Sequence, residues 1–326
     1  MRRLSILVLG LIALAGCSPG GSQSGKTIIR FATDWRAEAE HGGFYEALAT
    51  GEYAKRGLDV HIIPGGSTTN VPELVASGAV ELGDGSNSFI VMNLADVHAP
   101  VRAVAAFMQK DPQVLLAHPD AGINSIADMK GHPILLSDAS KTAFWPWLKA
   151  KYGFTDDQVR SYTFDNGPFI LDHHVVQEGY LTSEPYTIEK AAKFAPKVFL
   201  LADQGYPSYA AMVLAPDTLI SKNPAAVKAF VEASAIGWKN YLHGDPKPAD
   251  DLIMKDNPEM TEDVLAQARD KMRQYGLVDG GDAATLGVGA MTDAHWADFF
   301  KIASPKGTQN ARDAYSLQFL PNPPVK

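Results

Sequence analysis

Two hydrophobic periods alternate along the first third of the chain. Runs of about four to eight apolar or β-branched residues predict strands, and longer runs with an apolar residue every three or four positions predict helices. The predicted order is a strand at 27–31, a helix at 41–55, a strand at 58–63, a helix at 71–77, a strand at 80–82, a helix at 86–95 and a strand at 101–107. Strands that alternate with helices indicate an α/β lobe built from βαβ units.

A second α/β set lies between two apolar, strand-like segments, 113–117 and 210–214. It contains predicted strands at 133–136 and 197–201 and a predicted helix at 142–152. Beyond residue 214 the helical period dominates, at 224–241, 261–275 and 293–302. These helices would return to the first lobe. We therefore predict two α/β lobes joined by a two-strand hinge, the first formed by residues 27–112 and 211–326 and the second by residues 113–210.

The N-terminus has the pattern of a bacterial lipoprotein signal. Arg2 and Arg3 precede an apolar run at 4–14, and the sequence LAGC ends at Cys17. The apolar run is shorter than the about 20 residues that cross a bilayer. We predict a signal peptide over residues 1–16, a lipid on Cys17 and a Gly- and Ser-rich tether over residues 17–26. The acyl chains would hold a monomer at the periplasmic face of the cell membrane.

Composition narrows the classes of partner. The formal charge is −8, and removal of the two N-terminal arginines with the signal makes it more negative, so nucleic acid is not an expected partner. The single cysteine is the expected lipidation site, which leaves no disulfide within the chain. His173 and His174 are adjacent and project differently, and no third ligand is evident at metal spacing, so no metal site is predicted.

Several short segments follow one another in the order and spacing of a known family. They are DWRAEAEHGGFY at 34–45, GEY at 51–53, GLDV at 57–60, GAVELG at 78–83, SIADMKG at 125–131 and NP at 223–224 before a helix. Together they resemble the SsuA/THI5-like (NMT1) solute-binding family over about residues 27–241. The resemblance implies a periplasmic-binding-protein fold of type II, in which two lobes close over a small-molecule ligand. It also implies an ABC permease and its ATPase as partners.

Members of this family bind thiamine-precursor pyrimidines, riboflavin, taurine, alkanesulfonates or nitrate, and one branch is an enzyme, the fungal thiamine pyrimidine synthase. That branch uses a lysine that carries pyridoxal phosphate, a nearby histidine and a cysteine-rich iron motif. Here GDGSNS at 83–88 contains no lysine, Phe89 lies where the histidine would fall, and YPSYAA at 206–211 contains no cysteine. A Schiff base needs an amine. The chain is therefore expected to bind without a cofactor, with the synthase-like enzyme as the alternative.

Candidate ligand contacts lie at strand-end turns and in loops rich in glycine and hydroxyl groups, where open α/β sheets place ligands. The candidates are Asp34, Trp35, His41, Gly66, Ser67, Ser86, Asn87, Ser137, Thr142, Trp145, Asp165, Glu184, Tyr186 and Tyr209. Ordinary structural roles remain open for them. Trp35 or Trp145 could pack in a hydrophobic core. Asp34 or His41 could cap a helix, and Glu184 could be a carboxylate at a helix N-terminus.

The chemistry of these candidates indicates the kind of ligand. Aromatic rings and carboxylates recur among them, and the glycine- and hydroxyl-rich loops at 65–70, 85–88 and 137–142 contain no arginine. Oxyanion sites generally use arginine or dense N–H donors. A neutral or cationic amino-heteroaromatic, such as a thiamine-precursor pyrimidine, is therefore favoured over riboflavin, taurine or an alkanesulfonate. We expect Trp35 to stack on the ring, and Glu184 and Asp34 to accept hydrogen bonds from its amino groups.

Overall fold

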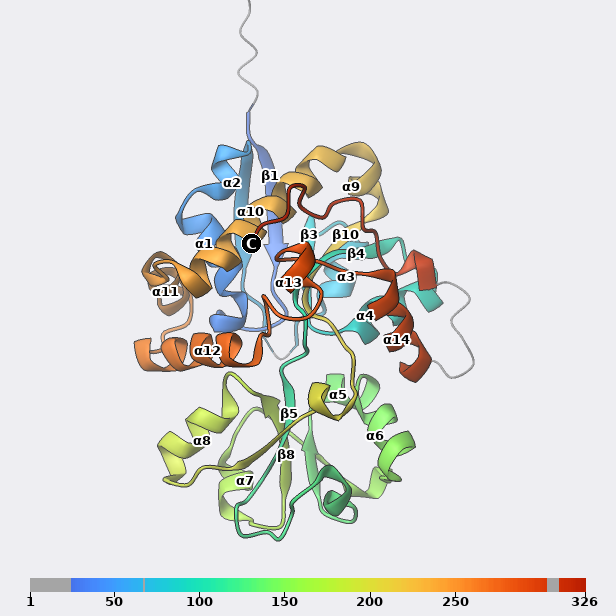
Figure 1. Ribbon diagram of the computed structural model, residues 1–326, viewed down its shortest axis with the longest axis vertical. Coiled ribbons are helices and arrows are strands. Elements are labelled where there is room, and N and C mark those ends of the chain that lie inside the picture. The colour runs from blue at the N-terminus through green and yellow to red at the C-terminus, as the bar shows by residue number, and fades with distance from the viewer. Residues whose placement is uncertain (1–24, 67, 304–310) are drawn as a thin grey trace, which may run out of the picture.

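The structure is a computed structural model, and it describes residues 25–66, 68–303 and 311–326. The predicted signal peptide, the lipidation of Cys17, most of the predicted tether and the candidate Ser67 lie outside the described residues. Figure 1 shows two α/β lobes, one above the other, and the chain passes between them before β5 and again before β10. The predicted fold class is confirmed.

The first lobe is built on a five-stranded sheet with the order β2-β1-β3-β10-β4. Its strands are β1 (Thr27–Ala32), β2 (Leu58–Ile63), β3 (Leu82–Gly85), β4 (Val101–Met108) and β10 (Ala210–Pro216). β1 pairs in parallel with β2 and β3, whereas β10 is antiparallel to β3 and β4. β10 therefore brings the chain back from the second lobe into the middle of the first sheet.

The second lobe has a sheet with the order β7-β6-β8-β5-β9. Its strands are β5 (Gln113–Ala117), β6 (Ile134–Leu136), β7 (Val159–Ser161), β8 (Val176–Tyr180) and β9 (Lys197–Leu200). β6 is parallel to β7 and β8, and β5 is antiparallel to β8 and β9. Because β5 starts and β8 ends at the hinge, Tyr180 lies opposite Gln113 at the edge that faces the first lobe.

Helices cover both sheets. Those of the first lobe are α1 (Gly42–Ala49), α2 (Glu52–Lys55), α3 (Val71–Ala76), α4 (Ser88–Asp96), α9 (Asp217–Lys222), α10 (Pro224–His243), α11 (Lys247–Asp256), α12 (Glu262–Tyr275), α13 (Ala283–Leu286) and α14 (Asp293–Ala303). Those of the second are α5 (Asp138–Thr142), α6 (Trp145–Tyr152), α7 (Gly167–Leu171) and α8 (Glu184–Ala192). Short 3-10 turns lie at Ala39–His41, Ile126–Met129, Asp156–Gln158, Ala202–Gln204 and Ala311–Asp313.

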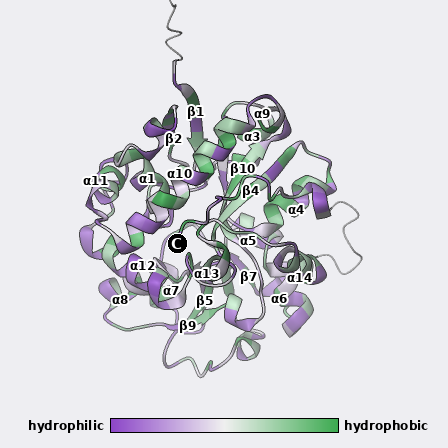
Figure 2. Ribbon diagram, turned by 45° about the horizontal axis from the view of Figure 1, so that its top comes forward, coloured by the Kyte–Doolittle hydropathy of each residue, from purple (hydrophilic) through white to green (hydrophobic). Residues whose placement is uncertain are grey.

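The helix predicted at 41–55 is two helices in the structure. Gly51 has a φ of 74°, which is in the left-handed region that favours glycine, and it separates α1 from α2. Among the described residues, no helix has the length and apolar character that a membrane crossing requires. In Figure 2 the hydrophobic colouring follows the central strands β4 and β10, and hydrophilic residues dominate the surface helices α8 and α12.

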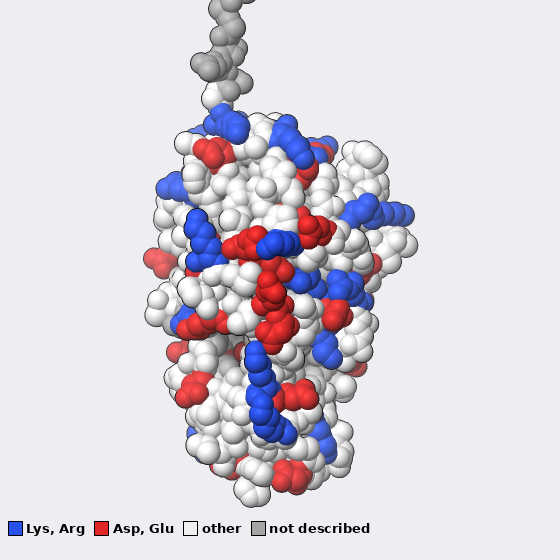
Figure 3. Space-filling model, turned by 90° about the vertical axis from the view of Figure 1, so that its left-hand side faces the viewer, with Lys and Arg blue, Asp and Glu red and all other residues white. Residues whose placement is uncertain are grey.

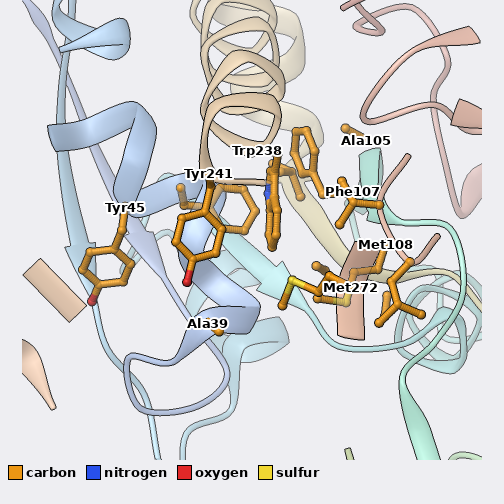
Figure 4. Packing of buried hydrophobic residues seen from close by; sticks show 14 of the residues in the cluster. Ala39, Tyr45, Ala105, Phe107, Met108, Trp238, Tyr241 and Met272 are labelled. Carbon is orange, nitrogen blue, oxygen red and sulfur yellow. The ribbon is translucent and has the colours of Figure 1, made fainter. Parts of the chain in front are cut away.

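Close packing of α1 against α10 fixes the segment that carries the site. A Cβ on Gly43 would lie 2.0 Å from the Trp238 ring, and a Cβ on Gly237 would lie 2.1 Å from the backbone oxygen of Gly43. Glycine at both positions thus allows the helices to approach. Figure 4 shows Trp238 and Tyr241 of α10 beside Phe107 and other buried side chains. This packing holds the N-terminal end of α1, and with it His41, against the first sheet.

Candidate ligand-binding site

The two lobes touch through an aromatic contact and a hydrogen-bonded contact. The rings of Trp35, after β1, and Phe164, in the second lobe, have centroids 4.2 Å apart. Phe164 is 44% exposed and has a φ of 63°, which is an uncommon conformation for a bulky residue. The hydroxyl of Thr182, in the second lobe, donates to the buried carboxylate of Glu40 in the first. The lobes are therefore closed on each other at this place.

A third interlobe contact joins α8 to α12. The Tyr186 hydroxyl and the Lys190 ammonium both donate to Oδ2 of Asp263, at 2.7 Å and 2.8 Å. Figure 3 shows basic side chains of the lower lobe directly below acidic side chains of the upper lobe on this face. These groups are exposed, so they form a surface clasp at the margin of the interlobe site.

An Asp–His–Asp cluster lies at the carboxyl ends of β1 and β3. Nε2 of His41 is 3.2 Å from Oδ1 of Asp34 and 3.6 Å from Oδ2 of Asp84. Burial alone would lower the pKa of His41, but hydrogen bonds to the two carboxylates and their charges outweigh it and raise that pKa to about 10. His41 therefore carries a positive charge near pH 7.

The two aspartates respond differently to that imidazolium. Burial favours the neutral form of Asp34, but the hydrogen bond and charge of His41 outweigh burial and hold the pKa of Asp34 below its usual value. At Asp84, burial and the charge of Asp34 raise the pKa to about 7 in spite of His41. Asp34 is thus ionised at neutral pH, whereas Asp84 is poised to gain or lose a proton.

The second lobe contributes Glu184 at the N-terminus of α8. The backbone N–H of Tyr180 donates to its Oε2 at 2.6 Å, and the Tyr162 hydroxyl lies 3.5 Å from its Oε1. A Cβ on Gly179 would come within 2.8 Å of the Glu184 side chain, so glycine there lets the carboxylate fold back onto β8. Burial raises the pKa of Glu184 to about 7, against the N–H donors and with the help of nearby carboxylates.

Further carboxylates surround these groups. Burial, followed by the charges of Glu40 and Glu184, raises the pKa of Glu38 well above its usual value. Burial also raises the pKa of the Tyr180 hydroxyl, and carboxylates of the first lobe add to that effect although Tyr180 belongs to the second. The interlobe site thus gathers Asp34, Glu38, Glu40, Asp84, Glu178 and Glu184. Arg36, beside Trp35 in sequence, is half exposed and pairs with Glu259 at 2.7 Å instead.

Three buried polar atoms in this region have no hydrogen-bond partner within the described part of the chain. They are Nδ1 of His41, Oδ1 of Asp84 and Oε2 of Glu178. Oε1 of Glu178 accepts from the backbone N–H of Ser137 at 2.7 Å, so only its second oxygen is left over. Buried polar atoms are normally paired, and those that are not indicate where a ligand or water binds. The two carboxylate oxygens are acceptors and favour a ligand with N–H donors, whereas Nδ1 of the protonated His41 carries a hydrogen and would donate to an acceptor atom of the ligand.

Several predicted contacts are brought together here. Asp34, Trp35, His41 and Glu184 all lie at the interlobe contact, and the N–H of Ser137 reaches it through Glu178. Trp35 is partly exposed and contacts an aromatic residue of the other lobe, so it is not a simple core residue.

Other candidates have a structural role. Asn87 and Ser137 cap α4 and α5, Gly66 accepts from Thr69 in a turn, and Ser86 lies half-buried between β3 and α4. Asp165 is exposed and accepts from the N–H of Gly167, and Tyr186 belongs to the α8–α12 clasp.

Two predictions need correction. Trp145 is 2% exposed, and its indole N–H donates to Asp156 at 2.8 Å, so it packs in the core of the second lobe. Tyr209 is fully buried; its hydroxyl donates to Asp282 at 2.6 Å and its ring stacks on His295, which turns it away from the carboxylate cluster. Thr142 is exposed, and its hydroxyl donates to the Ala139 carbonyl of its own helix, so its predicted contact with a ligand stays a prediction.

Some residues of the site were not predicted. Glu38 and Glu40 lie between the predicted contacts Trp35 and His41, and Asp84 lies in β3 just before Ser86. Charged residues are usually exposed, so nothing local predicts that Glu40 and Asp84 are buried. Phe164 and Tyr180 lie on a loop and at a strand end of the second lobe. Their position opposite the first lobe depends on how the lobes are set against each other.

Comparison with known proteins places the fold in a family. The model of the family described as NMT1/THI5 like matches residues 38–249, which include parts of both lobes. The chain belongs to this family. The predicted resemblance is confirmed.

Among curated relatives, a formylaminopyrimidine-binding protein from Halalkalibacterium halodurans is 25% identical over 321 residues, which cover 96% of this chain and 89% of the relative. A riboflavin-binding protein, RibY, from Chloroflexus aurantiacus is 24% identical over 260 residues, which cover 76% and 71%. The solved structure of a putative sulfonate-binding protein, SsuA, from Methylobacillus flagellatus has a TM-score of 0.63 at 16% identity and covers 90% of this chain and 93% of that chain.

These comparisons confirm the periplasmic-binding-protein fold, and together they support a solute-binding protein of the ABC-importer type with an extracytoplasmic location. The named relatives are binding proteins, which supports binding rather than catalysis at the level of the NMT1/THI5-like family. They differ from one another in ligand, so the ligand has to be argued from the residues of this site.

The Asp34–His41–Asp84 cluster also has the composition of a metal site. One ligand atom from each residue lies within 4.8 Å of the others. A histidine must be in its neutral form to bind a metal ion. Because the pKa of His41 is raised to about 10, a metal would have to displace its proton, and the proton already supplies the positive charge that the two carboxylates need.

Proposed function

We propose that the chain captures a cationic or donor-rich amino-heteroaromatic, such as a thiamine-precursor pyrimidine, and delivers it to an ABC permease and its ATPase. The observation that carries this proposal is the cluster of carboxylates from both lobes at the interlobe contact. Its principal positive charge among the described residues is His41, with Lys141 beside Glu178. A bound cation would relieve the mutual repulsion of these carboxylates.

The aromatic pair provides the place for the ring. Trp35 and Phe164 are in direct contact, with centroids 4.2 Å apart. A planar ligand between them needs the two faces about 7 Å apart, which is two van der Waals separations. The lobes must therefore separate by about 3 Å at this place, or one ring must turn aside, before a heteroaromatic ring enters. Stacking between rings of different lobes would couple binding to closure.

Polar groups of both lobes would then form hydrogen bonds with the substituents of the ligand ring. Glu184 and Asp34 are placed to accept hydrogen bonds from amino groups, and Oδ1 of Asp84 and Oε2 of Glu178 are acceptors without partners. An alkanesulfonate or taurine sulfonate would bring an anion among like charges, with no arginine to receive it. The similarity to RibY keeps riboflavin, a neutral heteroaromatic, as the second candidate.

The proposed location at the membrane rests on the lipoprotein signal in the sequence. The acyl chains on Cys17 would tether a monomer to the membrane near its permease, through residues 17–26. The synthase-like alternative would need a lysine for pyridoxal phosphate, and residues 83–88 contain none.

Isothermal titration calorimetry with four probes tests the ligand class. They are 4-amino-5-(aminomethyl)pyrimidine, its neutral N-formyl derivative, riboflavin and taurine. We expect both pyrimidines to bind, the charged one more tightly, and taurine not to bind. Tight taurine binding without pyrimidine binding would overturn the ligand class and leave the solute-binding role intact. Tight riboflavin binding alone would select the second candidate.

A further inference from the structure

A second cluster of ligand atoms lies at the far end of the second lobe. His118 and Asp120 follow β5, and His173 precedes β8. One ligand atom from each lies within 4.8 Å of the others. β5 starts at the hinge and β8, which is antiparallel to it, ends there. The cluster follows β5 and precedes β8, so it is separated from the interlobe site by the length of β5, on the order of 15 Å. It lies next to α7, since Nε2 of His118 is 2.6 Å from the carbonyl of Phe169, and Figure 1 shows α7 in the lower part of the second lobe.

Two facing turns bring these residues together. The N–H of Ala121 donates to the carbonyl of His118, which closes a turn that contains Asp120. The N–H of Val175 donates to the carbonyl of Asp172, which closes a second turn that contains His173. Nδ1 of His173 lies 2.9 Å from Oδ2 of Asp120, and the two imidazole rings are stacked with centroids 4.1 Å apart.

The buried histidine is oriented as a metal ligand. His118 is 1% exposed, and its Nε2 lies 2.6 Å from the backbone carbonyl of Phe169. A carbonyl only accepts, so Nε2 carries the hydrogen and the lone pair of a neutral His118 is on Nδ1. Metal-binding histidines usually donate their other N–H to a carbonyl or carboxylate in this way. Packing against Phe169 and Phe194 fixes the ring plane.

We propose that His118, Asp120 and His173 bind a divalent transition-metal ion such as Zn²⁺, separately from the solute site. Two imidazoles and a carboxylate are a common ligand set for zinc, and water would take the fourth position. In a tetrahedral site, ligand atoms bound to one zinc ion at about 2.0–2.1 Å lie about 3.4 Å apart. The three ligand atoms lie within 4.8 Å of one another. To share one ion, the exposed side chains of Asp120 and His173 would move inward by up to about 1.4 Å, and the His173 ring would turn out of its stack on His118.

Calorimetric titration of the full chain with ZnCl₂ tests this site. We expect saturable binding that is weakened at least tenfold in His173→Gln and in Asp120→Asn. Both residues are more than half exposed, so these variants keep the buried core intact. His174→Gln is the matched control: it changes an exposed histidine next to His173 that does not belong to the cluster, and it should bind zinc as the parent does.

A Co²⁺ titration adds a readout that a surface ion pair alone would not give. Inner-sphere binding to imidazole and carboxylate should produce visible ligand-field bands in the parent and in His174→Gln, but not in His173→Gln. Binding should also weaken in acid, because protons compete with the metal ion for histidine. The proposal is wrong if the parent shows no saturable zinc binding, or if His173→Gln and Asp120→Asn bind zinc as tightly as the parent.

Discussion

Glu184→Gln removes one charge from the interlobe site while keeping the shape of the side chain. The remaining amide oxygen can still accept the N–H of Tyr180, which donates to Glu184 at 2.6 Å. The fold of the second lobe should therefore persist. What is lost is a carboxylate that would accept a charge-assisted hydrogen bond from the ligand. Such a bond contributes about 1.5–3 kcal/mol, which corresponds to a loss of affinity of about tenfold to a hundredfold.

The pH dependence gives a sharper test than a single affinity. The pKa of Glu184 is raised to about 7, chiefly by burial, so the carboxylate is mostly protonated at about pH 6 and mostly ionised at about pH 8. A cation binds the ionised form, and affinity should rise with pH by about tenfold for each carboxyl group that ionises in this range. Asp84, with a pKa of about 7, contributes a second step. Glu184→Gln should retain only the step that belongs to Asp84.

The assay is calorimetric titration with 4-amino-5-(aminomethyl)pyrimidine at three pH values between about 6 and 8, where its ammonium group stays charged. Glu189→Gln is the matched control, because Glu189 lies on the same helix and is exposed; it should behave as the parent. Equal affinity and an equal pH slope in Glu184→Gln and the parent would refute the role of Glu184. A fall in affinity with rising pH would refute the cationic ligand as well.

Three further predictions concern other parts of the chain. Trp35→Ala should lower pyrimidine affinity by about tenfold in calorimetry, since stacking contributes up to about 1.5 kcal/mol, and Trp35→Phe should lose less; equal losses would argue against stacking. His41→Gln leaves Asp84 in a buried acidic pair without its cation and should lower the free energy of unfolding in urea by about 3 kcal/mol near pH 7, with part restored by adding Asp84→Asn. Because the pKa of His41 is raised to about 10, this advantage of the parent should be full below about pH 6.5 and decline as the pH approaches 10; a pH-independent difference would contradict it. Cys17→Ala should move the protein from the membrane to the soluble fraction, and unchanged partitioning would exclude the lipid anchor.

Local pattern was sufficient for most of the fold. The strand predicted at 58–63 is β2, and the two apolar segments at 113–117 and 210–214 lie in β5 and β10. β5 and β10 are buried along their whole length, so their sequences are continuous apolar runs. The predicted helix at 41–55 failed at Gly51, where a positive φ interrupts it. A single glycine in a helical pattern does not show by itself whether it is tolerated or ends the helix.

Sequence alone could suggest site residues only where they follow a strand or begin a helix. Asp34 and Glu184 were predicted as ligand contacts because carboxyl ends of strands and helix starts face ligands in α/β proteins; the structure places both at the interlobe contact, and their role in binding stays a prediction. Trp145 was misplaced because its partner, Asp156, follows eleven residues later and nothing local indicates that pairing. The grouping of His118, Asp120 and His173 was not predicted for the same reason: His118 and His173 lie in separate turns that meet only when β5 pairs with β8.

The distribution of charge between the lobes suggests why ligand binding and closure belong together. Glu184 and Glu40 come from different lobes, and each disfavours ionisation of the carboxyl groups around it. Closing the empty protein therefore requires that some carboxyl groups stay protonated, and the clasp of Asp263 with Lys190 offsets only part of the cost because it is exposed to solvent. A cationic ligand removes the conflict, since it lets the same groups ionise as the lobes meet. It interacts more strongly with the closed state than with the open one, and this difference in interaction is what shifts a conformational equilibrium.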